Sequence, residues 1–199
     1  MKLELQFHDL KKTISLTERV AGKHLTLPVL SCLFFEVKKG FLTTKATNLD
    51  VGVEATVTAK SDKEEKFALP ASVLSSFVSQ ITEYDGIISL ELVSGNIQIK
   101  ALKSKGVIKC VPHEDFPDIP TVKDGKKVVI SPNLIIKGLK SVWYSASVSS
   151  VKPELSSVYL YTKDGKLNFV STDSFRLAEK RVQLPANASV DDILIPFKN

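Results

Sequence analysis

The segment S-T-D-S-F-R, residues 171–176, brings hydroxyl, carboxylate and guanidinium groups close together in the sequence. Such a cluster could serve nucleophilic catalysis, which needs a nucleophile, a base and a group that orients the base. The histidines His8, His24 and His113 all lie in the first part of the chain, and no G-x-S-x-G or H-E-x-x-H motif occurs. The sequence therefore disfavours a hydrolase that uses residues 171–176. It predicts instead a turn in which Asp173 caps backbone N–H groups.

No cofactor or metal site is expected, because there is no glycine-rich phosphate loop and no His, Cys, Asp or Glu cluster with metal-ligand spacing. Cys32 and Cys110 lie in apolar, strand-like runs, which predicts buried free thiols in a reducing compartment. No apolar run reaches the ~20 residues of a membrane span, and the N-terminus has no signal-peptide pattern. We therefore expect a cytoplasmic protein without a membrane partner. The net charge of +5 lies entirely after residue 124 and is compatible with a polyanionic partner.

An internal repeat organises the chain. Shifted by 125 residues, residues 28–57 align with residues 153–182 without a gap, and nine of the 30 positions are identical. The similarity continues upstream, where residues 8–22 fall on residues 132–146, and downstream, where F-A-L-P matches I-L-I-P. We interpret this pattern as the duplication of a domain of about 120 residues.

The first copy is predicted to contain two helices and several short antiparallel strands, which is an α+β architecture. Leu10, Ile14 and Thr17 share one face of the first helix. A second helix opens at Pro70 and has an apolar face that includes Val73. Strands are predicted near residues 2–6, 29–37, 40–47, 51–58, 65–69, 86–93, 96–102 and 105–111.

The second copy repeats only part of this order. It is predicted to have a first strand at 127–131, a helix with Trp143 on its core face, three middle strands and a strand that ends at Pro196. A counterpart of residues 74–111 is not found before Asn199. The predicted domains are a complete one at 1–122 and a truncated one at 123–199.

Basic side chains gather on the predicted helices. In the first helix they lie opposite the apolar face, and the matching helix of the second copy carries no acidic residue. Such faces are either ordinary solvated helix surfaces or a phosphate-binding surface, repeated by the duplication, that reads no base sequence. The residues are Lys11, Lys12, Arg19 and Lys23 in the first copy, and Lys137 and Lys140 in the second.

Short motifs along the whole chain resemble those of the bacterial sliding clamp family, the beta subunit of DNA polymerase III. They are L-P-V-L-S, T-N-L-D-V-G-V-E-A and D-F-P in the first copy, and P-E-L-S-S-V, T-D-S-F-R-L-A and I-L-I-P in the second. The resemblance implies tandem DNA-clamp domains, each with two helices packed on antiparallel sheets of short strands. It also implies a third such domain, which residues 1–199 do not contain.

The function that the resemblance implies is that of a non-catalytic processivity factor. Two subunits of the family close into a ring around double-stranded DNA, which slides without sequence preference and tethers the replicative polymerase. The basic helix residues named above would contact the DNA. The resemblance assigns further contacts to two loop positions, where this chain has His24 and Ser149 in place of the side chains often found there.

The resemblance further implies a pocket that binds the polymerase and the clamp loader through short apolar motifs. Leu155 and Leu177 would form its apolar floor and Arg176 part of its polar rim. The family's usual Gly-His or Gly-Tyr pair is Ser174-Phe175 here, and the opposite wall belongs to the third domain. The implied pocket residues of this chain are Leu155, Thr172, Ser174, Phe175, Arg176 and Leu177.

Ring closure in the family uses an edge strand of the first domain, which corresponds to residues 106–110 with Gly106 and the apolar residues Val107 and Ile108. Because the third domain is not among residues 1–199, we expect this edge to be unpaired. The closed homodimer is then a property of the full-length family members and not of residues 1–199. The alternative interpretation is a clamp-fold adaptor that binds peptides and does not encircle DNA.

Overall fold

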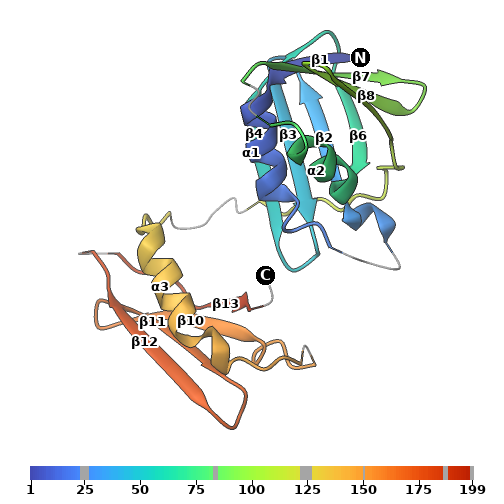
Figure 1. Ribbon diagram of the computed structural model, residues 1–199. Helices are drawn as coiled ribbons and strands as arrows, with labels where there is room; N and C mark the ends of the chain where they lie inside the picture. Colours follow the sequence, from blue (N-terminus) through green and yellow to red (C-terminus); the bar gives the residue numbers. More distant parts are fainter. Residues whose placement is uncertain (23–26, 83–84, 122–126, 150, 186–187, 198–199) are drawn as a thin grey trace. The chain divides into compact units, whose positions relative to one another are not determined.

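The structure is a computed structural model that describes residues 1–22, 27–82, 85–121, 127–149, 151–185 and 188–197. The chain divides into two compact units, Met1–Pro120 (unit 1) and Thr121–Asn199 (unit 2), whose elements are labelled in Figure 1. The predicted domain boundary at residue 122 lies outside the described residues.

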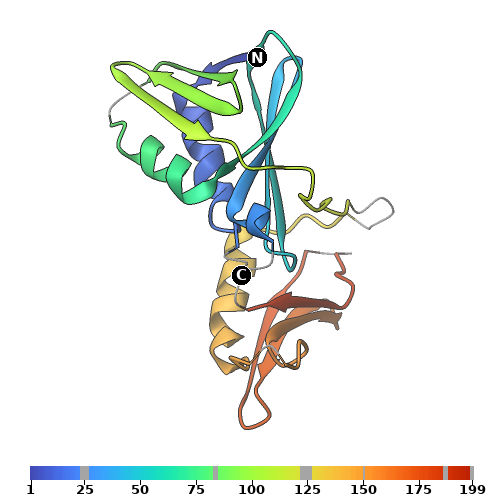
Figure 2. The ribbon, with the colours of Figure 1, turned by 90° about the vertical axis from the view of Figure 1, so that its right-hand side faces the viewer.

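Unit 1 is an α+β domain with two antiparallel sheets, as Figures 1 and 2 show. One sheet has the strand order β5-β1-β7-β8-β9 and the other the order β4-β3-β2-β6. The elements are β1 (Lys2–Gln6), α1 (Phe7–Thr17), a 3-10 turn (Pro28–Ser31), β2 (Cys32–Lys38), β3 (Phe41–Thr47), β4 (Gly52–Thr58), β5 (Lys60–Ser61), β6 (Glu65–Pro70), α2 (Ala71–Ser79), β7 (Ile87–Val93), β8 (Asn96–Ala101) and β9 (Ser104–Lys109).

Helix α1 packs on β4 and β3 through its predicted apolar face, where Leu10, Ile14 and Thr17 are buried. The helix ends at Thr17, five residues before the predicted end at Gly22. Helix α2 packs on α1, β2, β6 and β9. The face of α2 that is buried is narrower than the predicted apolar face, because the side chain of Val73 is 49% exposed. The narrower buried face follows the helical period of Leu74 and Val78.

Unit 2 contains a single sheet among its described residues, with the order β12-β11-β10-β13. This order repeats β4-β3-β2-β6, and α3 packs on β12 and β11 as α1 packs on β4 and β3. The elements are α3 (Pro132–Val142), a 3-10 turn (Trp143–Ser145), β10 (Ser157–Lys163), β11 (Lys166–Thr172), β12 (Leu177–Gln183) and β13 (Ile193–Pro196).

The helices show that the repeat keeps one shift of 125 residues, because α1 begins at Phe7 and α3 at Pro132. The sequence alignment of the helices, with residue 8 on residue 132, was therefore one residue out of register. The predicted strand at 127–131 is not a strand. In unit 1 the equivalent β1 is held between β5 and β7, and strand neighbours of this kind are not present beside 127–131 in the described part of unit 2.

The C-terminal end of α3 also differs from the prediction. The helix ends at Val142, which is fully buried, and the chain turns into a 3-10 conformation at Trp143. Trp143 is 51% exposed and does not face the core as predicted. The change of helical period at this point rotates the indole away from the row of buried side chains.

Gly138 allows α3 to approach the sheet closely. A Cβ atom at this position would lie 2.4 Å from two atoms of the Phe169 ring, which is itself fully buried in β11. The equivalent pair in unit 1 is Thr13 and Thr44, both buried. Unit 2 therefore fills this space with the large ring of Phe169 beside a glycine, whereas unit 1 fills it with two threonine side chains of intermediate size.

Candidate functional site

The turn between β11 and β12 is held by hydrogen bonds from its own side chains. The Oδ1 atom of Asp173 accepts the N–H groups of Phe175 and Arg176 at 3.0 and 2.9 Å. Thr172 Oγ1 accepts the N–H of Ser174 at 3.1 Å and donates to the carbonyl oxygen of Arg176 at 2.7 Å. Ser174 has a φ of 78°, in the left-handed region that favours glycine. The capping role predicted for Asp173 is confirmed.

Unit 1 contains the same turn 125 residues earlier, between β3 and β4. Asn48 Oδ1 accepts the N–H groups of Asp50 and Val51 at 3.1 and 2.9 Å. Thr47 Oγ1 accepts the N–H of Leu49 at 3.0 Å and donates to the carbonyl oxygen of Val51 at 3.0 Å. Leu49 has a φ of 77°. The two turns thus share a backbone conformation and differ in the side chains that they present.

The side chains at the tip of the unit 2 turn point to solvent. Phe175 is 98% exposed and Leu177 is 67% exposed. Arg176 Nε donates to Asp173 Oδ2 at 2.9 Å, which orients the guanidinium group beside the turn. The backbone N–H groups of Arg176 and Phe175, followed by the Arg176 side chain, hold the pKa of the Asp173 carboxyl below its ordinary value. An ionised, fully engaged carboxylate is unsuited to general base catalysis.

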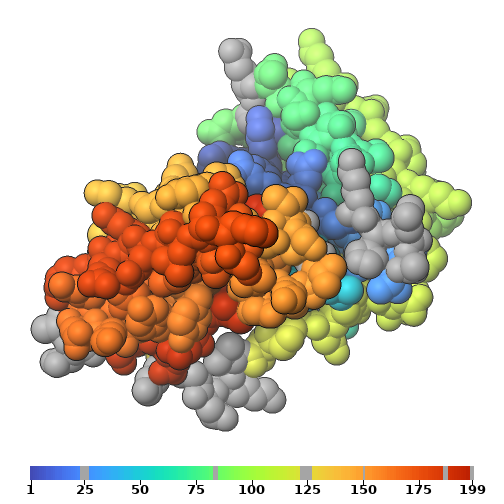
Figure 3. Space-filling model, turned by 90° about the horizontal axis from the view of Figure 1, so that it is seen from below, coloured from blue at the N-terminus to red at the C-terminus, as the bar shows by residue number. Residues whose placement is uncertain are grey.

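Sheet register brings Leu155 to the turn's end of unit 2. Strand β10 begins at Ser157, at the end of the sheet where β11 ends and β12 begins. Leu155 lies two residues before this start and is partly exposed, and its carbonyl oxygen accepts the N–H of Ser147 at 2.8 Å. In the space-filling view of Figure 3, the deeper orange region of β11 and β12 forms part of the surface that faces the viewer. Leu155 and the turn thus lie at one end of the sheet.

The basic residues of α1 and of the residues after it are exposed where they are described. Lys11, Lys12 and Arg19 all lie at the surface, and the Lys11 ammonium lies 5.7 Å from the centroid of the Phe7 ring. The nearby acidic Glu18 carboxylate accepts a hydrogen bond from Ser75 Oγ of α2, which directs its charge toward that helix. The predicted positions Lys23 and His24 lie outside the described residues.

Helix α3 presents Lys137 and Lys140 to solvent and carries no acidic residue. Ser141 Oγ donates a hydrogen bond to the main-chain carbonyl oxygen of Lys137. Ser149 is also exposed, and its N–H donates to Ser147 Oγ at 3.2 Å. Equivalent helices of the two units thus both display cationic surfaces suited to phosphate groups.

Comparison with protein families assigns both units. Residues 1–120 match the family described as DNA polymerase III beta subunit, N-terminal domain, and residues 129–199 match the central domain of the same subunit. The chain belongs to the DNA polymerase III beta subunit family. The predicted α+β fold with tandem clamp domains is confirmed by this match and by the solved structures that resemble it.

The relatives of this beta subunit family member are named as sliding clamps. The beta sliding clamp of Synechocystis sp. is 27% identical over 199 residues, covering 96% of this chain and 50% of that protein. A crystal structure of the DNA polymerase III beta subunit from Thermotoga maritima has a TM-score of 0.88 with 26% identity, covering 99% of this chain and 53% of that one. A Caulobacter crescentus sliding clamp structure reaches a TM-score of 0.90 with 24% identity, covering 100% and 55%. The chain spans about half the length of the curated relatives that it matches.

The strand predicted for a subunit interface corresponds to β9, the last strand in the order β5-β1-β7-β8-β9. Val107 is 67% exposed, whereas Ile108 is 6% exposed and belongs to the core of unit 1. A Cβ at Gly106 would lie 2.5 Å from the Phe77 ring of α2, so this glycine serves close helix packing. Of the three interface residues predicted, Val107 therefore offers the apolar surface.

Within the residues that the structure describes, no group of three or more His, Cys, Asp and Glu residues could hold a metal ion. No described helix is long and apolar enough to span a membrane.

Proposed function

We propose that the chain acts in a DNA sliding clamp, a non-catalytic processivity factor of DNA replication. Its ring would encircle duplex DNA and tether the replicative polymerase and the clamp loader in the cytoplasm. The observation that carries the proposal is the membership of both units in the DNA polymerase III beta subunit family. We also propose that residues 1–122 and 123–199 are the first two clamp domains.

The DNA-contacting surface would consist of the exposed cations on α1 and α3 and the polar residues of the adjoining loops. Exposed lysines hold phosphates through screened, water-separated contacts, which permit sliding because no base is read. The equivalent placement of α1 and α3 in the two units supports this, since a duplication repeats the same surface around a ring. The proposed residues are Lys11, Lys12, Arg19, Lys23, His24, Lys137, Lys140 and Ser149.

The peptide-docking surface would be the turn between β11 and β12 together with Leu155. The comparison of the two turns supports this assignment, because the same backbone carries Asp50, Val51 and Gly52 in unit 1 but Phe175, Arg176 and Leu177 in unit 2. Phe175 and Leu177 place two exposed apolar side chains within one turn, and adjoining exposed apolar side chains are typical of recognition surfaces. We propose that Leu155 and Leu177 contact an apolar anchor of the partner while Thr172 and Ser174 maintain the turn.

Ring closure would use the exposed side of β9 with Val107 as its apolar contact. An unpaired strand edge is a ready partner for another strand. We propose that residues 1–199 alone remain monomeric and that the closed homodimer needs the longer chain of the relatives. Sedimentation of residues 1–199 as a stable closed dimer would contradict this.

DNA binding is tested by titrating the chain with duplexes of different sequence over a salt series. Neutralising two lysines on α3, Lys137→Ala with Lys140→Ala, should reduce the slope of log K against log salt by about 1–2, because each phosphate contact contributes about 0.9. Lys103 and Lys105, exposed lysines in unit 1, supply the matched double alanine control. An unchanged slope in the α3 variant would exclude this helix as a contact surface.

Peptide docking is tested with a short peptide that carries Leu and Phe anchors, taken from the polymerase of a relative. Leu177→Ala and Arg176→Ala should each weaken its binding by roughly tenfold, as truncation of a central contact does. Val51→Ala changes the position in unit 1 that corresponds to Arg176, so it is the matched control and should bind normally. Peptide binding without any measurable DNA binding would favour the adaptor over the clamp. Turnover of a substrate that Ser174→Ala abolishes would overturn both.

A further inference from the structure

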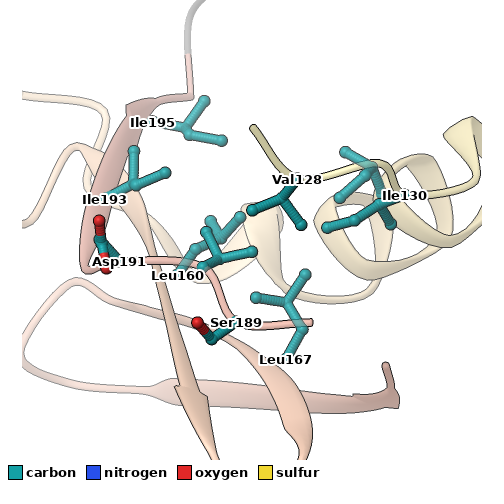
Figure 4. A pocket seen from close by; sticks show the side chains of 10 residues that line it. Val128, Ile130, Leu160, Leu167, Ser189, Asp191, Ile193 and Ile195 are labelled. Atoms are coloured by element: carbon teal, nitrogen blue, oxygen red, sulfur yellow. The ribbon is translucent and has the colours of Figure 1, made fainter. Parts of the chain in front are cut away.

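Strand β11 carries three inward-facing side chains, and only one of them is polar. Leu167, Phe169 and Ser171 alternate along the strand, and none of them is more than 3% exposed. Leu167 points into an apolar hollow of unit 2, shown in Figure 4, and Phe169 packs against Gly138 of α3. Ser171 lies directly before Thr172, which begins the turn of the proposed docking surface. Because Ser171 is buried, its hydroxyl group needs a hydrogen-bond partner inside the protein.

The partner of Ser171 is the end of helix α3. Its Oγ atom donates a hydrogen bond to the main-chain carbonyl oxygen of Val142, the last residue of α3. Both residues are buried. The last carbonyl groups of an α-helix have no N–H partner within the helix, so the strand here supplies a donor for one of them. The bond joins the end of a helix to the end of a strand 29 residues further along the chain.

A second hydrogen bond connects the same region to Leu155. Ser147 follows the 3-10 turn at the end of α3, and its N–H donates to the Leu155 carbonyl oxygen at 2.8 Å. The 3-10 turn itself, Trp143–Ser145, packs on β11 and β12, the two strands that the docking turn joins. The C-terminal end of α3 is thus connected to both parts of the proposed docking surface, the turn and Leu155.

Unit 1 contains the backbone link but cannot form the side-chain link. The N–H of Gly22 donates to the Leu30 carbonyl oxygen at 2.9 Å, which is the backbone link 125 residues earlier. The counterpart of Ser171 is Ala46, which is buried and has no hydroxyl group. The side-chain link therefore belongs to the unit whose turn carries the exposed recognition residues.

We propose that Ser171 is a positioning residue that couples the docking turn to helix α3, so that peptide binding strengthens the hold of α3 on DNA. The inference rests on the proposed function, because it joins the two surfaces assigned there. A peptide that holds the turn also holds Ser171 and, through its hydrogen bond, the end of α3. Lys140 lies two residues before Val142, so a phosphate contact at Lys140 then costs less conformational entropy. By linkage, DNA bound to α3 strengthens peptide binding by the same factor.

The strength of one buried hydrogen bond limits the size of this coupling. Two binding events influence each other only by the free energy of the contacts that differ between the linked and unlinked states. A buried hydrogen bond between neutral groups changes an equilibrium constant by a factor of about 2–10. We therefore expect saturating peptide to raise the affinity of the chain for duplex DNA by about 2–10-fold.

The experiment uses the intact 199-residue chain, a duplex DNA and a tryptophan-free peptide with Leu and Phe anchors. Peptide affinity is measured by the anisotropy of a labelled peptide with and without saturating duplex, and DNA affinity with and without saturating peptide, at one salt concentration. Trp143 is the single tryptophan of the chain and begins the 3-10 turn, so its fluorescence reports peptide-induced changes at the end of α3. The amides of residues 143–146 should also exchange more slowly when peptide is bound.

Two serine variants distinguish the coupling from a structural effect. Ser171→Ala introduces the residue that unit 1 has at position 46. Without DNA it should bind peptide within about threefold of the original affinity, but the mutual strengthening and the Trp143 response should be lost. Ser141→Ala is the matched control, because Ser141 Oγ also donates to a carbonyl oxygen of α3, that of Lys137, in a bond that stays within the helix. The control should keep both effects. The measurements on the unaltered chain keep the test valid if Ser171→Ala perturbs unit 2.

Three results would overturn the coupling. The first is independent binding, in which the affinity for each ligand is unchanged when the other saturates the chain. The second is weaker DNA binding in the presence of peptide, which is the opposite sign. The third is a Trp143 response that persists in Ser171→Ala, because the peptide would then act on the end of α3 by another route. Failure of the peptide or the duplex to bind alone would instead refute the proposed surfaces themselves, and the inference with them.

Discussion

Gly138 in α3 offers a direct test of how unit 2 is packed. Replacing it by alanine adds one Cβ atom that would lie 2.4 to 2.6 Å from three atoms of the Phe169 ring. Ordinary carbon contacts lie near 3.5–4.0 Å, so helix and ring must separate by about 1 Å. Phe169 is fully buried, so its ring has no route to solvent. We therefore expect Gly138→Ala to destabilise unit 2.

Two opposing contributions set how much Gly138→Ala changes the free energy of unfolding of unit 2. Overpacking of a well-filled core costs about 1–3 kcal/mol, and a clash with a confined ring belongs at the upper end. Alanine in a helix interior recovers about 1 kcal/mol relative to glycine. The net destabilisation is then about 2 kcal/mol. For a unit of this size, that corresponds to a decrease of roughly 8–16 °C in the midpoint of thermal unfolding.

Unfolding of unit 2 can be followed by the fluorescence of Trp143, since this is the only tryptophan in the chain. Ile136→Ala, on the exposed side of the same helix, is the control and should change stability by less than about 0.5 kcal/mol. The double variant Gly138→Ala with Phe169→Leu should show a favourable coupling of at least about 1 kcal/mol, because the clashing ring atoms are removed. If Gly138→Ala instead stabilises unit 2 by about 1 kcal/mol, the packing argument is refuted.

Three further outcomes are expected. Asp173→Asn should keep peptide affinity within roughly threefold of the original, because Asn48 accepts the same two backbone N–H groups in unit 1, whereas Asp173→Ala should weaken binding further. The pKa of Asp173 is lowered in the folded state, so its ionised carboxylate stabilises the turn fully above its ordinary pKa of about 3.9. This stabilisation is lost as the pH falls through the lower, folded-state pKa. Faster hydrogen exchange of the Phe175 amide should report the loss. Burial raises the pKa of the Cys32 and Cys110 thiols, so a disulfide reagent at pH 8 should modify them at least about tenfold more slowly in the native protein than in denaturant.

Much of the fold could be predicted from the sequence because the duplication shows each pattern twice. The turns at Gly40 and Gly165 and the strands on either side of them are where the aligned copies place them. The errors arise where neighbours decide the structure. The segment at 127–131 has strand-like residues, but no strand lies beside it among the residues that the structure describes, and the position of Trp143 depends on the end of α3. Local pattern does not contain that information.

The sequence predicts the self-capped turn of the candidate site, but it does not predict which side chains of β9 are buried. The polar residues Thr172 and Asp173 are typical of a self-capped turn, and both act in this way. The alignment of the repeat also predicts that unit 1 contains a matching turn, and Thr47 and Asn48 form there the hydrogen bonds that Thr172 and Asp173 form in unit 2. The burial of Ile108 was not predictable, because alternation along β9 fixes that its neighbours face opposite sides but not which side is the core.

Because the two turns share a backbone conformation, side chains of the unit 2 turn can be transferred to the unit 1 turn. The backbone of unit 1 already has the conformation that presents Phe175 and Arg176, so aromatic and guanidinium side chains can be grafted at Asp50 and Val51 without altering a main-chain hydrogen bond. The third position is restricted, because a Cβ at Gly52 would lie 2.7 Å from the side chain of Ile119. Two of the three positions proposed for recognition are therefore transferable, whereas the third is restricted by its packing against Ile119.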